Sequence, residues 1–419
     1  MAGSLLRLLG KTKVYLGLLA ALLLVLALAC APAAKPKIGV LLPLTGPLSE
    51  FGPNFQKAAN LAADHFKAAG YEVELKFADT ETNPSAGTQA ARRLVDVDRV
   101  NALVGAAASS VSMAVAEGVS IPKEIPQISY ASTSPLLTLL PADQGKDFLF
   151  RNVPSDALQG LVLGKLAREQ GFNTISILYV NNPYGQGLKD NFTKSFEAAG
   201  GKVLEAVPHP EEAQPTYVAE IKKAVANKPD ALVAISYPQH ATVYLKEAIE
   251  GNYIKKFLFT DGTKSLDIVK AVGAASVEGM VGTAPGSKEG ASLTAFNEQY
   301  KVKYGELPPL PYMTNSYDAV VILGLAALKA DKDGKALSGK NIRDQIRSVT
   351  NPGGEVVGAG ADGIKKAVKL IKEGKKINYE GASGSVDFDA NGDTVTPVEV
   401  WKYQGGNIVS VRLEDVAIP

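Results

Sequence analysis

Two adjacent serines, Ser109 and Ser110, place hydroxyl groups where a small anion could be bound. They follow an apolar run that predicts a strand, Ala102–Ala107, and precede a helical pattern that begins near Val111. Ligands of open parallel sheets bind beyond the carboxyl ends of the strands. The start of a helix also presents unpaired N–H groups and the positive end of its dipole. The pattern indicates anion binding, but it is equally typical of serines that only cap a helix, and both interpretations stay open.

Signatures of catalysis and of metal binding are missing from the sequence. The histidines, His65, His209 and His240, stand at no metal-ligand spacing with another ligating residue. The chain has no G-x-S-x-G and no Walker motif, and its one cysteine follows the first apolar run. We therefore expect a protein that is not an enzyme and that uses no cofactor and no metal. A hydrolase on the same fold would be recognised by turnover of its ligand.

Two other motifs match known sites only in part. Residues 358–363 read G-x-G-x-x-G before a helical pattern, but only the short Glu355–Val357 precedes them. We interpret them as a flexible connection and not as a dinucleotide site. Residues 387–392 begin like a calcium loop, yet the twelfth position is Val398 in place of a bidentate Glu. The flanks are typical of strands, so a hairpin turn is favoured.

The elements that must position these residues alternate between strands and helices. Strands are predicted at Lys37–Leu42, Val73–Ala78, Ala102–Ala107, Pro126–Tyr130, Thr174–Val180, Lys202–Val207, Ala231–Ser236, Phe257–Phe259 and Gly279–Ala284. Amphipathic helical patterns lie between most of them. This alternation predicts doubly wound parallel sheets. One sheet would need about a dozen strands, so we expect an α/β fold of two lobes. The tail, from 384 to 413, is typical of an antiparallel meander.

The N-terminal segment is typical of an export signal. Three positive charges precede an apolar run of 16 residues, Val14–Ala29, which is short for a bilayer span. Cys30, the only cysteine, follows directly and resembles the lipobox cysteine of bacterial lipoproteins, which takes a diacylglycerol. Cleavage by the ordinary signal peptidase after Ala27-x-Ala29 is the alternative. We expect a signal peptide at 1–29 and a lipidated tether at 30–35, with the protein exported and held at a membrane by its lipid.

The charge of the chain argues against a nucleic-acid partner. Its net charge is +1, and removal of residues 1–29 takes away three positive charges and leaves −2. No other long apolar run follows, so nothing else is expected to span a membrane. Without cysteine pairs, stability must come from packed cores, and a chain of this length is expected to form roughly two domains.

A series of motifs resembles one known family. It begins with Lys37–Pro47, which reads KIGVLLPLTGP, and continues through Asp79–Pro84, Ser129–Thr133, Asn182–Gly185 and Asn315–Asp318. In order and spacing these segments resemble the branched-chain amino-acid type of periplasmic binding proteins, over nearly all of residues 36–419. The resemblance implies a type I periplasmic binding protein fold, in which two lobes joined by three crossovers close on a ligand.

The resemblance and the breaks in the pattern predict how the chain divides. We expect lobe 1 at 36–152 plus 285–350, and lobe 2 at 153–284 plus 351–419. Fold-level analogy alone does not give function, so each site residue needs its own argument.

The resemblance implies roles for four polar positions. Ser109 aligns with the serine that binds the ligand carboxylate, Thr133 with a second hydroxyl for that group, and Ala131 with a carbonyl for the ligand ammonium. Asp261 stands where the family has an acid that pairs with the ammonium, since a buried cation needs such a partner. The family's acid is often Glu, and Asp is one methylene shorter, so a water could intervene. Lys264 could instead pair with Asp261, and 131–133 could form only a turn.

Four aromatic residues match wall positions of the same family. These are Phe51 and Tyr312 in lobe 1 and Tyr184 and Tyr237 in lobe 2. Aromatic side chains can cover a ligand face and end in a polar group, but each could equally be core packing. The small side chains of Ala106–Ala108 leave room beside them, which favours a neutral, mainly apolar ligand side chain.

Together these patterns predict a solute-binding lipoprotein of an ABC importer. It would capture a small ligand, a neutral or branched-chain amino acid, by closure of its lobes and pass it to a permease and ATPase. Two alternatives stay open: a ligand-sensing receptor of the same fold, and a binder of amides or small aromatic or aliphatic acids.

Overall fold

The computed structural model describes residues 35–416. The expected signal peptide at 1–29, Cys30 and the tether as far as 34 lie outside the described residues. From Pro36 onward the chain belongs to one structural unit. In its described part, no helix combines the length and the apolar character needed to cross a membrane.

The first sheet is entirely parallel and has the strand order β2-β1-β3-β4-β5. Its strands are β1 (Lys37–Leu42), β2 (Glu74–Asp79), β3 (Ala102–Val104), β4 (Gln127–Ser129) and β5 (Leu149–Arg151). In the register, Val40 of β1 lies between Phe77 and Val104. Strands buried on both faces read as continuous apolar runs, which explains why β1 has the bounds expected from its sequence. The predicted strand at 102–107 ends earlier, because Gly105–Ala107 leave the sheet.

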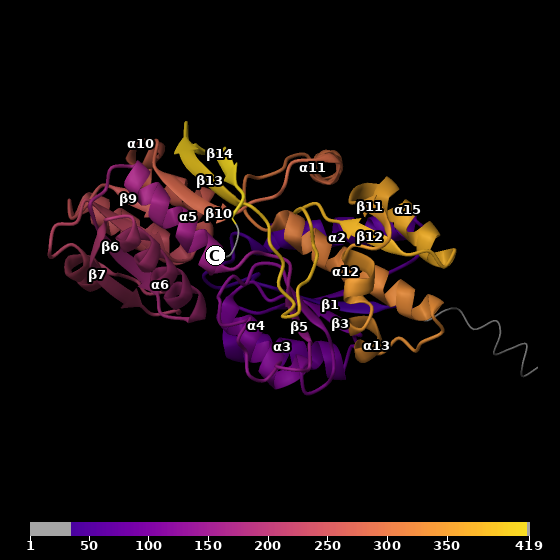
Figure 1. Ribbon diagram of the computed structural model, residues 1–419. Coiled ribbons are helices and arrows are strands. Elements are labelled where there is room, and N and C mark those ends of the chain that lie inside the picture. The colour runs from indigo at the N-terminus through magenta and orange to yellow at the C-terminus, as the bar shows by residue number, and fades with distance from the viewer. Residues whose placement is uncertain (1–34, 417–419) are drawn as a thin grey trace, which may run out of the picture. The chain divides into compact units, whose positions relative to one another are not determined.

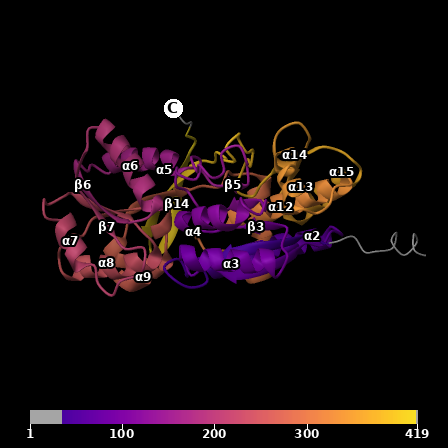
Figure 2. The ribbon, with the colours of Figure 1, turned by 90° about the horizontal axis from the view of Figure 1, so that it is seen from below.

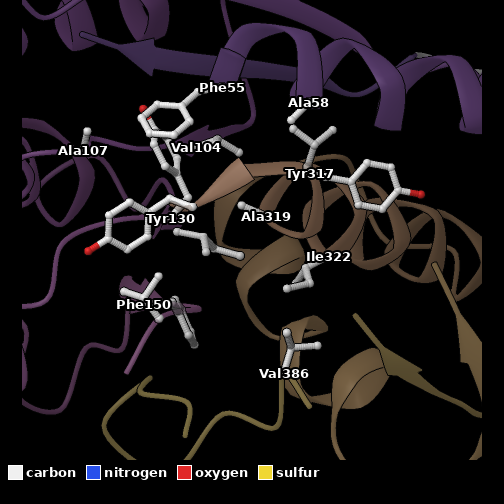
Figure 3. Packing of buried hydrophobic residues seen from close by; sticks show 14 of the residues in the cluster. Phe55, Ala58, Val104, Ala107, Tyr130, Phe150, Tyr317, Ala319, Ile322 and Val386 are labelled. Atoms are coloured by element: carbon white, nitrogen blue, oxygen red, sulfur yellow. The ribbon is translucent and has the colours of Figure 1, made fainter. Parts of the chain in front are cut away.

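Helices cover this sheet, and one of them, α12, lies in the hydrophobic core of the lobe (Figures 1 and 2). They are α2 (Gly52–Ala68), α3 (Pro84–Asp96), α4 (Ser109–Val115), the π-helical turn Ala116–Ser120, α11 (Ala291–Tyr304), α12 (Met313–Lys332), α13 (Gly339–Arg343) and α14 (Ile346–Thr350). Nearly every residue of α12 is buried, as expected of a helix that is apolar all round. Figure 3 shows its residues Tyr317, Ala319 and Ile322 among side chains from α2 and the first sheet.

The second sheet has the order β14-β13-β10-β9-β8-β6-β7. Its strands are β6 (Thr174–Val180), β7 (Lys202–His209), β8 (Ala231–Ile235), β9 (Phe257–Phe259), β10 (Val281–Pro285), β13 (Val398–Gln404) and β14 (Asn407–Glu414). The helices that belong with it are α5 (Asp156–Glu169), α6 (Pro183–Ala198), α7 (Val218–Ala224), α8 (Pro238–Glu250), the 3-10 turn Asp261–Thr263, α9 (Leu266–Val272) and α10 (Ala274–Val277). Strands β6 to β10 pair in parallel. The prediction of an α/β fold with two parallel-sheet lobes is confirmed.

The antiparallel tail forms the outer edge of the second sheet. β13 pairs with β10 and with β14 in antiparallel register. Gly405 and Gly406 both adopt positive φ, 59° and 76°, in the turn between β13 and β14, a conformation that hairpin turns require and glycine adopts without strain. Residues 384–388, also expected to be a strand, form only one isolated bridge. The Phe388 N–H donates to Asn351 Oδ1 (3.0 Å) and not to the backbone of a neighbouring strand.

A small third sheet shows that the chain crosses between the lobes later than expected. β11 (Glu355–Gly358) and β12 (Ile377–Glu380) pair in parallel on either side of α15 (Gly360–Lys372). α15 packs against α2 and α12, so this segment lies with the first sheet. The prediction that lobe 2 contains all of 351–419 is therefore wrong, because β11, α15 and β12 belong to lobe 1. The third crossover falls between β12 and β13. A local pattern cannot predict which of two apolar layers receives an amphipathic helix.

Candidate functional site

A small cavity lies where the carboxyl ends of the two parallel sheets face one another. Its lining residues are Leu48, Phe51, Phe55, Ala107, Ala108, Ser109, Ala131, Tyr184, Tyr237, Asp261, Gly262 and Tyr312. Seven of the nine residues predicted to bind the ligand are among them, while Ser110 and Thr133 are not. The cavity gives the centre of a water molecule about 20 Å³ in which to move. Roughly 10–15 Å³ on this measure holds one water, so the lobes enclose very little space.

Strand ends explain how residues far apart in the sequence come together. Ser109 begins α4 soon after β3, and Ala131 follows β4. Tyr184 lies in the first turn of α6 after β6, and Tyr237 directly precedes α8 after β8. Asp261 opens the 3-10 turn after β9. The carboxyl ends of parallel strands share one edge of the sheet, so each lobe presents its residues toward the other.

Ser109 and Ser110 do not act as helix caps. The N-cap of α4 is Ala108, and the N-cap side chain makes no capping hydrogen bond. The Ser109 hydroxyl oxygen accepts from Ser134 N (3.3 Å) and retains its own proton for a further bond. The Ser110 hydroxyl donates to Glu211 Oε1 of the second lobe at 2.5 Å. The capping interpretation is thus wrong for both, and Ser110 forms a contact between the lobes.

Asp261 is held in the cavity wall by three donors. Gln159 Nε2 and the Tyr184 hydroxyl donate to Oδ1, each at 2.8 Å, and the Tyr312 hydroxyl donates to Oδ2 at 2.5 Å. Burial raises the pKa of Asp261 above its usual value of 3.8, although these hydrogen bonds oppose the shift. The alternative partner Lys264 pairs with Glu399 instead (2.5 Å). The interpretation of Asp261 and Lys264 as a local ion pair is therefore wrong.

A second buried acid, Asp156, lies close to Asp261 and was not predicted from the sequence. It is fully buried, and neither carboxylate oxygen has a hydrogen-bond partner in the described chain. Burial raises the pKa of Asp156 well above 3.8, and the nearby charge of Asp261 adds to this shift, while the Thr133 hydroxyl and the charge of Arg151 oppose it. Its backbone N–H donates to the carbonyl of Thr133 (2.8 Å). Ser155-Asp156 is an ordinary helix start, so the sequence carries no signal for a functional acid there.

Thr133 lies beside this acid, and its side-chain hydroxyl is the relevant polar group. Its hydroxyl is buried without a hydrogen-bond partner of normal geometry among the described residues. Arg151 is the cation near this region, but it is committed elsewhere. Its guanidinium bonds to Asp393 (2.7 and 2.9 Å) and to the carbonyls of Thr133 and Ser134. No Lys, Arg or His of the described chain lines the cavity. The lining therefore combines the carboxylate of Asp261 with a neutral hydroxyl and aromatic walls, and Asp156 lies near Asp261 outside the lining.

Behind Tyr237 lies a polar layer that the sequence did not reveal. Tyr237 receives a hydrogen bond from Asn182 Nδ2 (2.9 Å), which also donates to Glu211 (2.7 Å). The His240 ring stacks on Tyr237, with ring centroids 5.6 Å apart. Burial lowers the pKa of His240 to about 3 and that of His209 to about 4, so both are neutral. They share the Ser236 hydroxyl as a hydrogen-bond partner.

The G-x-G-x-x-G stretch is a tight turn and not a flexible connection. It joins β11 to α15, where its N–H groups are already bonded: Ala359 N to Ser292 Oγ, Gly360 N to the Tyr317 hydroxyl, and Ala361 N to Gln299 Oε1. A Cβ at Gly360 would lie 2.9 Å from Ala295 of α11. The glycines thus allow α11 to approach, and these three N–H groups are not free to bind a pyrophosphate.

The calcium-like stretch forms a turn, but not the expected hairpin, because residues 384–388 before it are not a strand. Asp389 Oδ1 accepts from the N–H groups of Asn391 (2.8 Å) and Asp393 (3.0 Å), an Asx-type turn. Within the described residues, no group of three or more His, Cys, Asp or Glu side chains is arranged to hold a metal ion.

Comparison with known proteins agrees with this architecture. Residues 35–406 match the family described as periplasmic binding protein, and the chain belongs to this family of exported solute-binding proteins, which are not enzymes. The chain is 27% identical to the chemotactic signal transduction system substrate-binding protein BasB of Halobacterium salinarum, over 86% of this chain and 84% of that one.

Solved structures show the same fold. A leucine-binding protein, LivK, of Thermotoga maritima is 26% identical, with a TM-score of 0.75 over 91% of this chain and 99% of the other. A solute-binding protein of an ABC transporter from R. palustris, in complex with benzoate, has a TM-score of 0.74 over 92% and 98% of the two chains. At 18% identity it shows the fold alone. The resemblance to the branched-chain amino-acid type is confirmed.

Proposed function

We propose that the chain is the extracytoplasmic binding component of an ABC importer and that it captures a neutral amino acid between its two lobes. The observation that carries this proposal is the buried carboxylate of Asp261 in a cavity with no cation in its described lining. A second buried carboxylate, Asp156, lies near Asp261 but outside this lining. A buried carboxylate without a counter-charge is costly. A ligand that brings an ammonium group would supply that charge.

The two ends of a zwitterion would meet different groups. The Ser109 hydroxyl lines the cavity and retains a donor for the ligand carboxylate. The Thr133 hydroxyl lies beside Asp156 and outside the lining, so it would have to turn toward the ligand to add a second donor. The carbonyl of Ala131 and the carboxylates of Asp261 and Asp156 would take the ammonium. Ser109 belongs to the first lobe and Asp261 to the second, so both charges are satisfied only when the lobes close. The ligand would then shift the hinge equilibrium by its preference for the closed form.

The aromatic walls set the character of the ligand side chain. Phe51 and Phe55 approach from the first lobe, with ring centroids 6.0 Å apart, and Tyr184 and Tyr237 stack at 5.7 Å in the second. These surfaces favour an apolar side chain. Small aromatic acids are the competing class, in view of the neighbour solved with benzoate. They carry no cation and would leave both carboxylates uncompensated, so the amino acid is the better fit.

A screen of candidate ligands tests the proposal. Thermal shift and calorimetry on residues 36–419 would compare neutral amino acids, amides and small aromatic acids. A ligand that binds only the native state raises apparent stability by RT ln(1 + [L]/Kd). We expect neutral amino acids to give the largest shifts. Binding of aromatic acids with no response to any amino acid would refute the proposal.

A sensory role is the second candidate, favoured by the likeness to a chemotactic substrate-binding protein. Uptake of the labelled ligand in cells that contain a cognate permease and ATPase separates the two roles. Uptake lost on deletion of this chain supports import. A chemotactic response lost while uptake persists supports sensing.

The proposal includes a lipid anchor at Cys30, the lone cysteine at the end of the apolar run. The variant Cys30→Ser is expected to move the mature protein from the membrane to the soluble fraction. Fractionation and intact-mass measurement check this. Unchanged membrane association of the variant, with no mass difference from lipid, would contradict the anchor and leave ligand capture untouched.

A further inference from the structure

A second and larger hollow lies directly beside the ligand cavity. The volume open to the centre of a water molecule is about 390 Å³ in this hollow and about 20 Å³ in the ligand cavity. Pockets that hold small molecules have volumes of roughly 300–1,000 Å³. The hollow is open to solvent on one side and is lined by α11, the loop 307–311, the start of α12 and the hairpin of β13 and β14. Among the described residues, Tyr312 alone lines both spaces, so its side chain is the wall between them.

We propose that Tyr312 is a movable partition and that this hollow is the second half of the ligand site. The protein would then bind amino acids with neutral side chains longer than that of leucine, whose excess length passes Tyr312. This inference rests on the function proposed above. It is supported by the small size of the enclosed cavity, because an amino acid needs more room than one or two waters and the cavity must expand in some direction.

The other walls offer no such direction. Phe55 packs edge-on against Tyr130 with ring centroids 5.0 Å apart, and Tyr184 stacks on Tyr237. These side chains are at most 3% exposed and belong to the packed cores of their lobes. Displacing them would cost core packing. Tyr312 is also buried in this core, at 6% exposed, but among the described lining residues it alone borders the larger hollow as well.

Tyr312 is held in place by one hydrogen bond that a ligand could replace. Its hydroxyl donates to Asp261 Oδ2 at 2.5 Å. A ligand ammonium at Asp261 would compete for the same oxygen and release the ring. The backbone of Tyr312 has φ 66° and ψ 3°, a left-handed conformation that is strained for a bulky residue. Pro311 and the prolines before it fix the preceding φ angles. The partition would therefore move by side-chain rotation and not by refolding of the loop.

The lining of the hollow defines the ligand class. Phe296, Leu307 and Met313 make it partly apolar. The Ser287 and Thr314 hydroxyls bond to each other in its wall (2.9 Å) and could bond to a polar end group. The buried charges in the lining, Lys264 and Glu399, neutralise one another. A long neutral side chain fits these walls, either an aromatic one that ends in a hydroxyl or a thioether.

The experiment compares tyrosine and leucine by calorimetry on residues 36–419. Ser410 is exposed on β14 and lines the hollow, so Ser410→Trp fills it from outside. Val409 lies next to it on the same strand, exposed and outside the lining, because neighbouring strand residues point to opposite faces. Val409→Trp is the matched control, and thermal unfolding of both variants verifies that they fold.

The expected result is selective. Ser410→Trp should weaken tyrosine binding by about tenfold or more and leave leucine within about twofold, while Val409→Trp should change neither. Tyr312→Phe, which loses the bond to Asp261, should improve tyrosine binding relative to leucine. Leucine binding without tyrosine binding, or tyrosine affinity unaffected by Ser410→Trp, would overturn the partition and leave the proposed function standing. Failure of every neutral amino acid in the screen to bind the unaltered protein would overturn the proposed function itself.

Discussion

Replacing Asp156 by Asn should stabilise the protein and weaken its ligand binding at the same time. Both carboxylate oxygens of Asp156 are buried without a hydrogen-bond partner in the described part of the chain. A pKa raised by burial corresponds to about 1.4 kcal/mol of lost stability per unit once the group is ionised, and the amide keeps the shape while it removes the charge that causes this loss. The free energy of unfolding should therefore rise by roughly that amount. For a unit of this size the gain corresponds to roughly 1–4 °C in Tm.

The effect on binding has the opposite sign. If Asp156 helps to neutralise the ligand ammonium, its amide variant leaves that charge with Asp261 alone. Loss of one partner of a buried charge pair costs about 2 kcal/mol or more, which is roughly a 30-fold loss of affinity. Calorimetry with the best amino acid from the screen measures this loss, and chemical denaturation measures the stability.

Asp261→Asn is the matched comparison, because its carboxylate is as deeply buried but already hydrogen-bonded. The Asp261 carboxylate accepts hydrogen bonds from Gln159, Tyr184 and Tyr312. In the variant an NH2 group replaces one of its two oxygens, and NH2 cannot accept the hydrogen bond or bonds that this oxygen received. This variant should lose stability as well as affinity. A destabilised Asp156→Asn protein that binds as tightly as the parent would refute the reasoning, since Asp156 would then act only in the fold.

The pH dependence of stability provides a second test of the Asp156→Asn variant. Because the pKa of Asp156 is raised above 3.8, the folded protein binds a proton that the unfolded chain releases above that value. The corresponding stability is fully present below pH 3.8 and is lost as the pH rises through the folded-state pKa. The stability difference between Asp156→Asn and the parent should therefore grow with pH across this window. A difference that stays constant would contradict an ionisable, buried Asp156.

Contacts between the lobes give three further predictions. Ser110→Ala removes the bond to Glu211 and should weaken ligand binding by about 1–3 kcal/mol in calorimetry. Glu50→Gln weakens a contact with Ser265 and the first N–H groups of α9, and small-angle scattering should then find a more open average form. Burial raises the pKa of both Glu50 and Glu211 above 4.5, so closure should take up protons just above that pH. Calorimetry in buffers of different ionisation enthalpy measures the uptake, and a net proton release would contradict this prediction.

Much of the fold could be predicted because its signals are local. β1 and β6 have the bounds expected from their apolar runs, and the parallel-strand rule brings Ser109, Ala131 and Asp261 to one cavity. The third crossover could not be predicted in this way. α15 has a clear amphipathic pattern, but its apolar face would fit either lobe, and only packing against α2 and α12 decides between them.

The missed site residues had ordinary local explanations. Asp156 stands at the start of a helix, where acids are common. Glu211 lies in a polar loop next to Glu212, where charges usually face solvent. Their importance comes from burial by distant segments: α5 places Asp156 near Asp261, and Glu211 meets Ser110, 101 positions away in the sequence. Sequence spacing does not predict such long-range burial.

The hydrogen bonds that close the lobes also suggest how a ligand would be selected. Tyr312 meets Asp261 across the cavity, and Ser110 and Glu50 each bond to the opposite lobe. The closed form is thus partly satisfied by the protein itself, and a ligand shifts the equilibrium only through interactions that exceed those it displaces. At Asp261 a neutral donor would merely replace the Tyr312 hydroxyl. An ammonium also compensates the buried charge of Asp261 and its neighbour Asp156. Charge compensation at this pair, more than contact with the aromatic walls, is therefore what would distinguish an amino acid from an uncharged molecule of the same size.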